Sequence, residues 1–184
     1  MPDKPAADAQ AILDFWFGEV GPDGWWLRSA ETDAAIRARF LPLWEQWRLR
    51  PPASFAANAR DALAAVVLFD QFSRNMFRGD ARAFAADPLA REIAARAIDQ
   101  GLERQLAPDR RIFLYMPFMH SEDLADQDKA VALFEALGAP DQVRYAHMHR
   151  DIIARFGRFP ARNAALGRAD RPGEAEAIAA TAGW

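Results

Sequence analysis

The sequence predicts an all-α fold of about seven to nine helices, packed as antiparallel pairs in a single domain over residues 1–184. Long stretches repeat apolar residues every three or four positions, which is the period of an amphipathic helix. Proline, glycine and short polar side chains recur where such helices would begin and end. No stretch alternates strictly between apolar and polar residues, as a half-buried β-strand does. Short connections between the helices favour antiparallel neighbours.

The first two helices are predicted from their apolar spacing and their boundaries. Residues 7–18 (ADAQAILDFWFG) gather their large apolar side chains on one side, and Gly18 is expected to end this helix. A second helix is expected over 31–47, where isoleucine, phenylalanine, leucine and tryptophan recur at helical spacing. Ser29 or Thr32 should cap it, because a hydroxyl can accept a hydrogen bond from a free N–H of the first turn.

The third helix is predicted to be the buried centre of the fold. Ser54 should cap a helix over 55–72, and the second half of this stretch is apolar all round. Two prolines fall within other helical patterns, where they remove a backbone donor and clash with the preceding turn. Pro42 should therefore kink or split the second helix, and Pro117 should end a short helix that begins at residue 108.

The C-terminal half has clear helix boundaries. Asp87 and Pro88 should open a helix that Gly101 closes, as expected for an acidic start and a terminal glycine. Ser121 is expected to cap a helix over 122–138, whose first turn is acidic and therefore suits the helix dipole. Two further helices are predicted over 140–157 and 172–182.

Composition excludes several classes of protein. The chain has no cysteine, which rules out disulfides, zinc ribbons and thiol nucleophiles. Its net charge is −3 with both signs interleaved, so no basic surface for nucleic acid is expected. No window is apolar enough to span a membrane and the N-terminus lacks a signal-peptide core, so a cytoplasmic protein is expected.

The histidines do not suggest a metal site. His147 and His149 lie two residues apart and would diverge on a helix, whereas chelating pairs are three or four apart. His147 is expected on the solvent-exposed face of this helix. His149 falls on the apolar stripe, either as a hydrogen-bonded core histidine or as a residue that lines a cleft. No metal and no cofactor are expected.

His120 precedes a predicted helix N-terminus, where free N–H groups favour anions. Ser121, Glu122 and Asp123 could make this an anion site or could simply cap the helix, since acids already favour that positive end. A pairing of Glu122 with a histidine could also serve as an acid–base pair.

Asp70 follows the least polar run of the chain, so it should be buried and must have a cationic partner. Arg74 lies one helical turn onward, and Arg158 or Arg162 could compete for the same carboxylate. The pairing would either lock two helices together or orient an arginine toward a ligand.

Two turns combine an arginine and an asparagine with flanking aromatic residues, at 69–79 (FDQFSRNMFRG) and 156–168 (FGRFPARNAALGR). Aromatic anchors would hold each arginine, whose planar fork suits a carboxylate or a phosphate. The same residue types also satisfy helix-end carbonyls. The candidate ligand-binding residues are Arg74, Asn75, His120, His149, Arg158, Arg162 and Asn163, with Asp70 and Glu122 as supporting acids.

Five motifs of the chain resemble those of a bacterial domain-of-unknown-function family. They are FWFG at 15–18, WW at 25–26, FDQFSRNMFRG at 69–79, FLYMPFMHSEDLADQ at 113–127 and HRDIIARFGRFPARNAALGR at 149–168. The resemblance covers nearly the whole chain and implies a tetratricopeptide-repeat-like, all-helical fold. It implies no activity. The family often has a histidine in the turn before Arg-Asn, where this chain has Ala161. If that histidine is an obligatory catalyst or metal ligand, this chain should lack the function, so its absence disfavours catalysis.

The favoured interpretation is a binding module whose Arg/Asn/His pocket takes a small anionic ligand or an acidic peptide end. One alternative is a metal-independent hydrolase or lyase that uses His149 or His120 with Glu122 or Asp70. No nucleophile motif, phosphate loop or metal cluster supports catalysis. A second alternative is a structural or assembly protein whose motifs only hold helices together.

Overall fold

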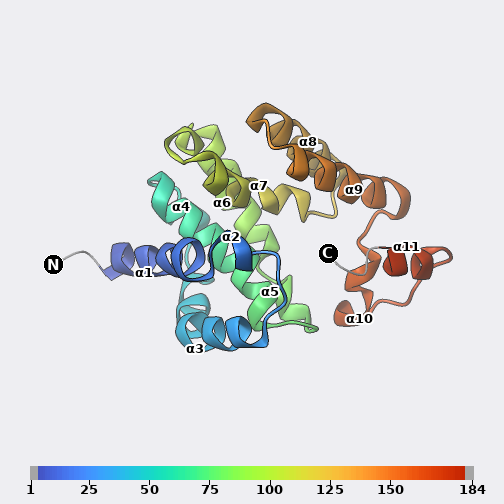
Figure 1. Cartoon of the computed structure of the whole chain (residues 1–184), viewed down its shortest axis with the longest axis horizontal. Coiled ribbons are helices and arrows are strands. Elements are labelled where there is room, and N and C mark those ends of the chain that lie inside the picture. Colours follow the sequence, from blue (N-terminus) through green and yellow to red (C-terminus); the bar gives the residue numbers. More distant parts are fainter. Residues whose placement is uncertain (1–3, 181–184) are drawn as a thin grey trace. The chain divides into compact units, whose positions relative to one another are not determined.

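The computed structural model describes residues 4–180, and these residues form helices and connecting turns without a β-strand (Figure 1). The all-α prediction is therefore confirmed. Seven helices have eight residues or more, which agrees with the predicted number of substantial helices. The longer helices are α1 (Lys4–Leu13), α3 (Ala30–Trp47), α4 (Ala59–Val66), α6 (Asp87–Asp99), α7 (Pro108–Met119), α8 (Leu124–Leu137) and α9 (Pro140–Phe156). The short ones are α2 (Gly21–Gly24), α5 (Ser73–Met76), α10 (Asn163–Leu166) and α11 (Glu174–Ala180).

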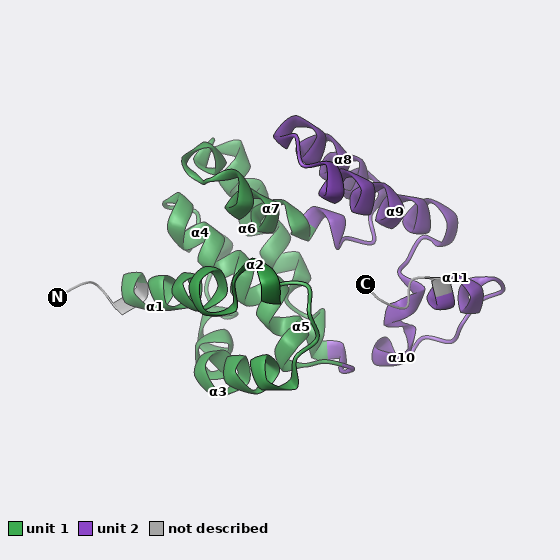
Figure 2. Ribbon diagram, viewed as in Figure 1, with its two compact units in different colours: residues 1–78, 82–117 green, residues 79–81, 118–184 purple. Residues whose placement is uncertain are grey.

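The chain divides into two compact units (Figure 2). Unit 1 comprises residues 1–78 and 82–117, and unit 2 comprises residues 79–81 and 118–184. That residues 1–184 form one domain stays a prediction, as does a tetratricopeptide-repeat-like arrangement of the helices.

The core of unit 1 is a continuous helical run made of α4, η3 (Val67–Phe72) and α5. Helices α1, α3 and α6 pack against this run. Every residue from Ala62 to Asp70 is buried, so the prediction of a buried central helix is confirmed. Segment η3 is π-helical, with the wider turn of i→i+5 hydrogen bonds, and such segments are frequent at functional sites.

A second π-helical segment, η1 (Asp14–Val20), follows α1 and packs on the central run through aromatic rings. Phe15 and Trp16 each meet Phe72 edge to face, at centroid distances of 5.8 and 5.6 Å. This is a favourable arrangement for aromatic pairs. Because η1 continues the helical path, the expected end at Gly18 is wrong, and η1 ends before Gly21, which has a positive φ of 63° and an extended ψ.

Two predicted caps are also wrong, because a better acceptor lies closer to the helix. Ser54 lies in the 3₁₀ turn η2 (Pro52–Ser54), and Asn58 caps α4 by accepting from the N–H of Asp61 at 2.9 Å. Ser121 is replaced as cap by Asp123, whose carboxylate accepts from the N–H of Ala125 at 2.8 Å. Ser29 caps α3, as one of the two predicted choices.

The prolines interrupt the helices less than predicted. Helix α3 continues through Pro42, so it is not split. Helix α7 passes Pro117 and ends at Met119, so the expected end at Pro117 is wrong. A proline so near the C-terminus of a helix removes one hydrogen bond and leaves little helix beyond it to break.

In unit 2, α8 and α9 pack against each other and are joined by a two-residue connection. Gly138 and Gly157 end these helices in the left-handed conformation, with φ 71° and 68°, as predicted. After Gly157 come the 3₁₀ turn η6 (Pro160–Arg162), α10 and α11, and η6 packs on α11. None of the helices described is long and apolar enough to cross a bilayer.

Candidate functional site

The structure brings Arg74 to Asp70 in unit 1. This carboxylate is fully buried in the π-helical segment η3, which confirms its predicted burial. Arg74, one turn onward, places its Nη1 atom 3.2 Å from Asp70 Oδ1 and donates to the Asp70 carbonyl at 2.6 Å. The amide of Gln71 donates to the other carboxylate oxygen at 2.6 Å. The predicted pairing of Asp70 with Arg74 is therefore present.

Arg74 also forms a bidentate pair with Asp87, the first residue of α6, at 3.0 Å for both hydrogen bonds. Burial alone would lower the pKa of Arg74, but the charges of Asp70 and Asp87 outweigh it and raise this pKa. The guanidinium is thus held in its charged form between two carboxylates from different helical segments. Sequence reasoning assigned Asp87 only to the opening of its helix.

The side chain of Asn75 binds a different acid, Asp33, rather than Asp70. Its side-chain amide donates to Asp33 of α3 at 2.7 Å, and Arg78 forms a bidentate pair with the same carboxylate at 2.8 and 2.9 Å. Burial alone would raise the pKa of Asp33, but these hydrogen bonds outweigh it and lower the pKa. The turn after α5 is thereby fixed to α3.

In unit 2, Arg158 is buried and bound to Glu174, the first residue of α11. Its Nε and Nη2 atoms donate to the two carboxylate oxygens at 2.8 and 2.7 Å. Asn163 donates to Glu174 at 3.0 Å and to Asp170 at 2.8 Å. The hydrogen bonds from Arg158, together with those from Asn163 and the N–H of Arg171, lower the pKa of Glu174 to about 2, despite the desolvation that opposes them.

Glu122 also lies among hydrogen-bond donors. Arg168 binds both of its carboxylate oxygens, at 2.8 and 2.9 Å, and the N–H of Phe159 donates to it at 2.7 Å. Burial alone would raise the pKa of Glu122, but these bonds hold it below its ordinary value. The carboxylate therefore fixes the turn at Phe159 rather than acting as a proton donor at neutral pH.

The two candidate histidines of unit 2 lie beside the same turn. The rings of His120 and His149 have centroids 6.2 Å apart, and His149 meets the ring of Phe159 edge to face at 5.5 Å. Arg162 lies over the Phe159 ring at 4.6 Å and donates to the carbonyl of His120 at 2.7 Å. His120, His149 and Arg162 are all half-buried. His147 is exposed, as predicted.

Sequence reasoning missed the acids and the arginine that hold these turns, namely Asp33, Asp87, Arg168, Asp170 and Glu174. Three of them stand at or near a helix start, where an acid is expected for the helix dipole alone. No local signal distinguishes such an acid from one that binds a distant arginine. Within residues 4–180, no group of three or more His, Asp or Glu side chains is arranged to hold a metal ion.

These features define an all-helical protein in which arginine–carboxylate clusters hold aromatic turns in place. Residues 12–182 match the family model described as bacterial protein of unknown function (DUF924), and the chain belongs to this family. The chain is also similar to a solved structure, a protein of unknown function from Agrobacterium tumefaciens. The two are 40% identical with a TM-score of 0.89, over 95% of this chain and 98% of the other. No curated protein matches the sequence significantly.

Proposed function

We propose that the protein is a binding module for a small carboxylate or phosphate, held in unit 2 by His120, His149 and Arg162. The observation that carries this proposal is the convergence of two imidazoles and a guanidinium on one turn. The imidazole centroids are 6.2 Å apart, and the arginine reaches the backbone of one of the two histidines. A carboxylate or phosphate oxygen suits imidazole and guanidinium nitrogens, of which Nδ1 of His149 already contacts the carbonyl oxygen of Tyr145 at 2.8 Å.

The arginine of this site is held by its surroundings. The ring of Phe159 supports the guanidinium of Arg162, and the N–H of Phe159 is itself fixed by Glu122. A guanidinium held in one orientation loses less conformational entropy when it binds a ligand. The half-buried position also strengthens its attraction for an anion relative to a fully solvated side chain.

The other predicted site residues bind acids of their own unit instead of contacting the ligand. In unit 2, Arg158 and Asn163 bind Glu174 and hold α11 near Phe159 and Pro160. In unit 1, Arg74 and Asn75 bind buried or half-buried acids. The proposal therefore divides the predicted set into three ligand-binding residues and four that maintain the fold.

A hydrolase or lyase remains the alternative function, with a histidine as base and Glu122 or Asp70 to orient it. An orienting carboxylate must accept a hydrogen bond from the imidazole. Glu122 already accepts from both terminal nitrogens of Arg168 and from a backbone N–H. This arrangement favours binding over acid–base chemistry.

Thermal-shift measurements with inorganic phosphate and with succinate at constant ionic strength test the proposal. A ligand present at about 100 times its dissociation constant adds about 2.7 kcal/mol to the free energy of unfolding. We expect a saturable rise in Tm that His149→Gln and Arg162→Lys both reduce.

The matched control is His147→Gln, which changes an exposed histidine on the same helix α9. If both anions stabilise the His149→Gln and His147→Gln variants equally, the anion site is not where we place it. If neither anion stabilises the wild-type protein, the proposed ligand class is wrong.

A further inference from the structure

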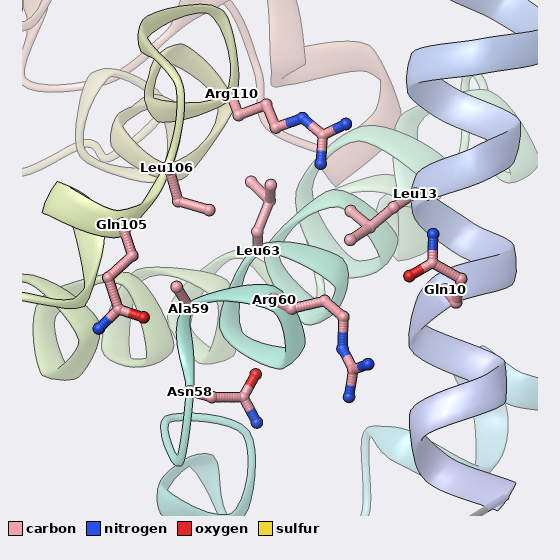
Figure 3. Close-up of a pocket in the computed structure, with 9 residues that line it drawn as sticks. All are labelled: Gln10, Leu13, Asn58, Ala59, Arg60, Leu63, Gln105, Leu106 and Arg110. Atoms are coloured by element: carbon pink, nitrogen blue, oxygen red, sulfur yellow. The ribbon is translucent and has the colours of Figure 1, made fainter. Parts of the chain in front are cut away.

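A groove of about 450 Å³ opens in unit 1, and none of the candidate site residues predicted from the sequence lines it. It lies among α1, the start of α4 and the segment that leads from residue 105 into α7 (Figure 3). Its volume is within the range of sites for small molecules. The groove is lined by Gln10, Leu13, Asn58, Ala59, Arg60, Leu63, Gln105, Leu106 and Arg110.

Two arginines line this groove and no carboxylate does, although Asp61 and Asp14 bind residues of its lining. The guanidinium of Arg110 lies 4.9 Å over the ring of Phe17, which holds it in place. Among residues 4–180, no carboxylate lies within ion-pairing distance of Arg110. Arg60 also lines the groove and binds the neighbouring Asp61 through its Nε atom at 3.0 Å.

Amide side chains supply the remaining polar groups. Gln105 is exposed, and its side chain forms no hydrogen bond with another residue of the described chain. Gln10 donates to Asp14 at 2.7 Å, so its carbonyl oxygen can still accept. The side chain of Asn58 is occupied, because it caps α4 and donates to Asp61 at 2.8 Å. An amide donates and accepts, and it therefore suits a ligand with hydroxyl groups.

The apolar floor is small, because its leucines are already packed. Leu63 is fully buried, and Leu13 and Leu106 are 3% and 8% exposed. A long aliphatic ligand would therefore bury little additional apolar surface here. The groove is better matched to a compact polar anion than to a fatty acid.

We propose that this groove binds a phosphate monoester of a small polyhydroxylated molecule. Arg110 holds the phosphate through its planar fork, and Arg60 adds a second positive charge. Gln105 and Gln10 contact the hydroxyl groups. The site uses residues of unit 1 only and does not depend on the anion site proposed in unit 2.

Glucose 6-phosphate is the probe, titrated into the full-length protein and followed by backbone-amide NMR shifts. Inorganic phosphate and glucose are titrated separately, since the first supplies only the phosphate and the second only the hydroxyl groups of the proposed ligand. We expect saturable shifts at residues of the groove and a dissociation constant about tenfold lower for the ester than for either half, a factor worth 1.4 kcal/mol. Arg110→Gln should weaken this binding at least about tenfold, because it removes the charge-assisted hydrogen bonds.

Arg96→Gln is the matched control, because Arg96 is an exposed arginine of unit 1 outside the groove, paired with Glu92. It should leave the affinity unchanged. Arg110→Lys keeps the positive charge but lacks the planar guanidinium. Its affinity for the ester should lie between those of wild type and Arg110→Gln, which separates loss of recognition from loss of folding. Three outcomes each overturn the proposal: no saturable shifts at the groove, equal affinities for the ester and for inorganic phosphate, or equal effects of Arg110→Gln and Arg96→Gln.

Discussion

The two Arg-Asn turns share a sequence pattern but stabilise different parts of the fold. In unit 1, Arg74 binds Asp70, which precedes it by one turn in the buried central run, and Asp87 at the start of α6. In unit 2, the buried arginine is Arg158, and its partner Glu174 starts α11 near the end of the chain. The first turn thus locks a core of long helices, and the second fastens a segment of short ones.

The difference follows from how much each segment can bury without help. The central run of unit 1 is buried from Ala62 to Asp70, and α1, α3 and α6 pack against it. Helices α10 and α11 have four and seven residues, too short to be stable alone in water. A buried ion pair with further hydrogen bonds gives such a segment one preferred position. A similar sequence pattern therefore indicates a rigid turn in both units. The position of the acid that binds the arginine decides which helices the turn fastens together.

The largest effect should come from Asp70→Ala in unit 1. This substitution removes a fully buried carboxylate and leaves the half-buried guanidinium of Arg74 with one acid where there were two. The loss should approach that of a truly buried pair, about 3–5 kcal/mol. Urea unfolding measures the loss as a lower midpoint. Asp99→Ala, an exposed acid at the end of α6, is the control. An unchanged midpoint for Asp70→Ala would break the comparison, because the core of unit 1 would then not depend on its ion pair.

A pH-dependent effect should follow from Glu174 in unit 2. Its pKa is lowered to about 2 from an ordinary value of 4.5, so its charged form stabilises the folded state. This contribution is fully present above pH 4.5 and is lost as the pH falls toward 2. Glu174→Gln should lower Tm by several degrees at neutral pH, and the difference from wild type should shrink on acidification.

Differential scanning calorimetry at neutral pH and at successively lower pH measures this difference. Glu176→Gln, on the exposed side of the same helix, is the matched control and should show no such trend. A Glu174→Gln deficit that stays constant with pH would mean that the carboxylate is not held by Arg158.

The two asparagines allow a finer comparison. Asn163 is buried and donates to two carboxylates, so Asn163→Ala should cost about 1–3 kcal/mol. Asn75→Ala should cost less, about 1 kcal/mol, because Arg78 still binds the same Asp33. Urea unfolding of both variants decides the order. A larger loss for Asn75→Ala than for Asn163→Ala would show that the turn of unit 1, and not that of unit 2, depends on its asparagine side chain.

The smallest effect is expected from His147→Ala. This histidine is exposed on α9, so its replacement should change the free energy of unfolding by less than about 0.5 kcal/mol. The same urea experiments measure it beside the other variants. A larger loss would mean that this face of α9 is covered by a contact.

The sequence predicted those features that depend on neighbouring residues. Helical spacing and terminal glycines located α8 and α9, and the apolar run before Asp70 predicted its burial and its pairing with Arg74. Other features depend on competition between neighbours. Asn58 and Asp123 displaced serines as caps because their side chains reach the free N–H groups from a closer position.

Features that depend on distant residues could not be predicted in this way. Glu174 and Asp87 read as ordinary acids in a first helical turn, and only the folded chain brings them to Arg158 and Arg74. The groove beside Arg110 draws on three separate stretches of sequence, none of which has a recognisable motif. Its residues were therefore absent from the predicted site.

The π-helical segment η3 gives the chain between Val67 and Phe72 a tolerance in length that the rest of the central run lacks. A π turn closes i→i+5 hydrogen bonds and so holds one residue more than an α turn. Removing one residue here would let the segment close into an ordinary α-helix, and Arg74 would keep its direction relative to α4. The same deletion inside α4 would instead rotate the rest of the central run by about 100°, so natural or designed variants of this protein should accept a single-residue deletion in η3 more readily than in α4.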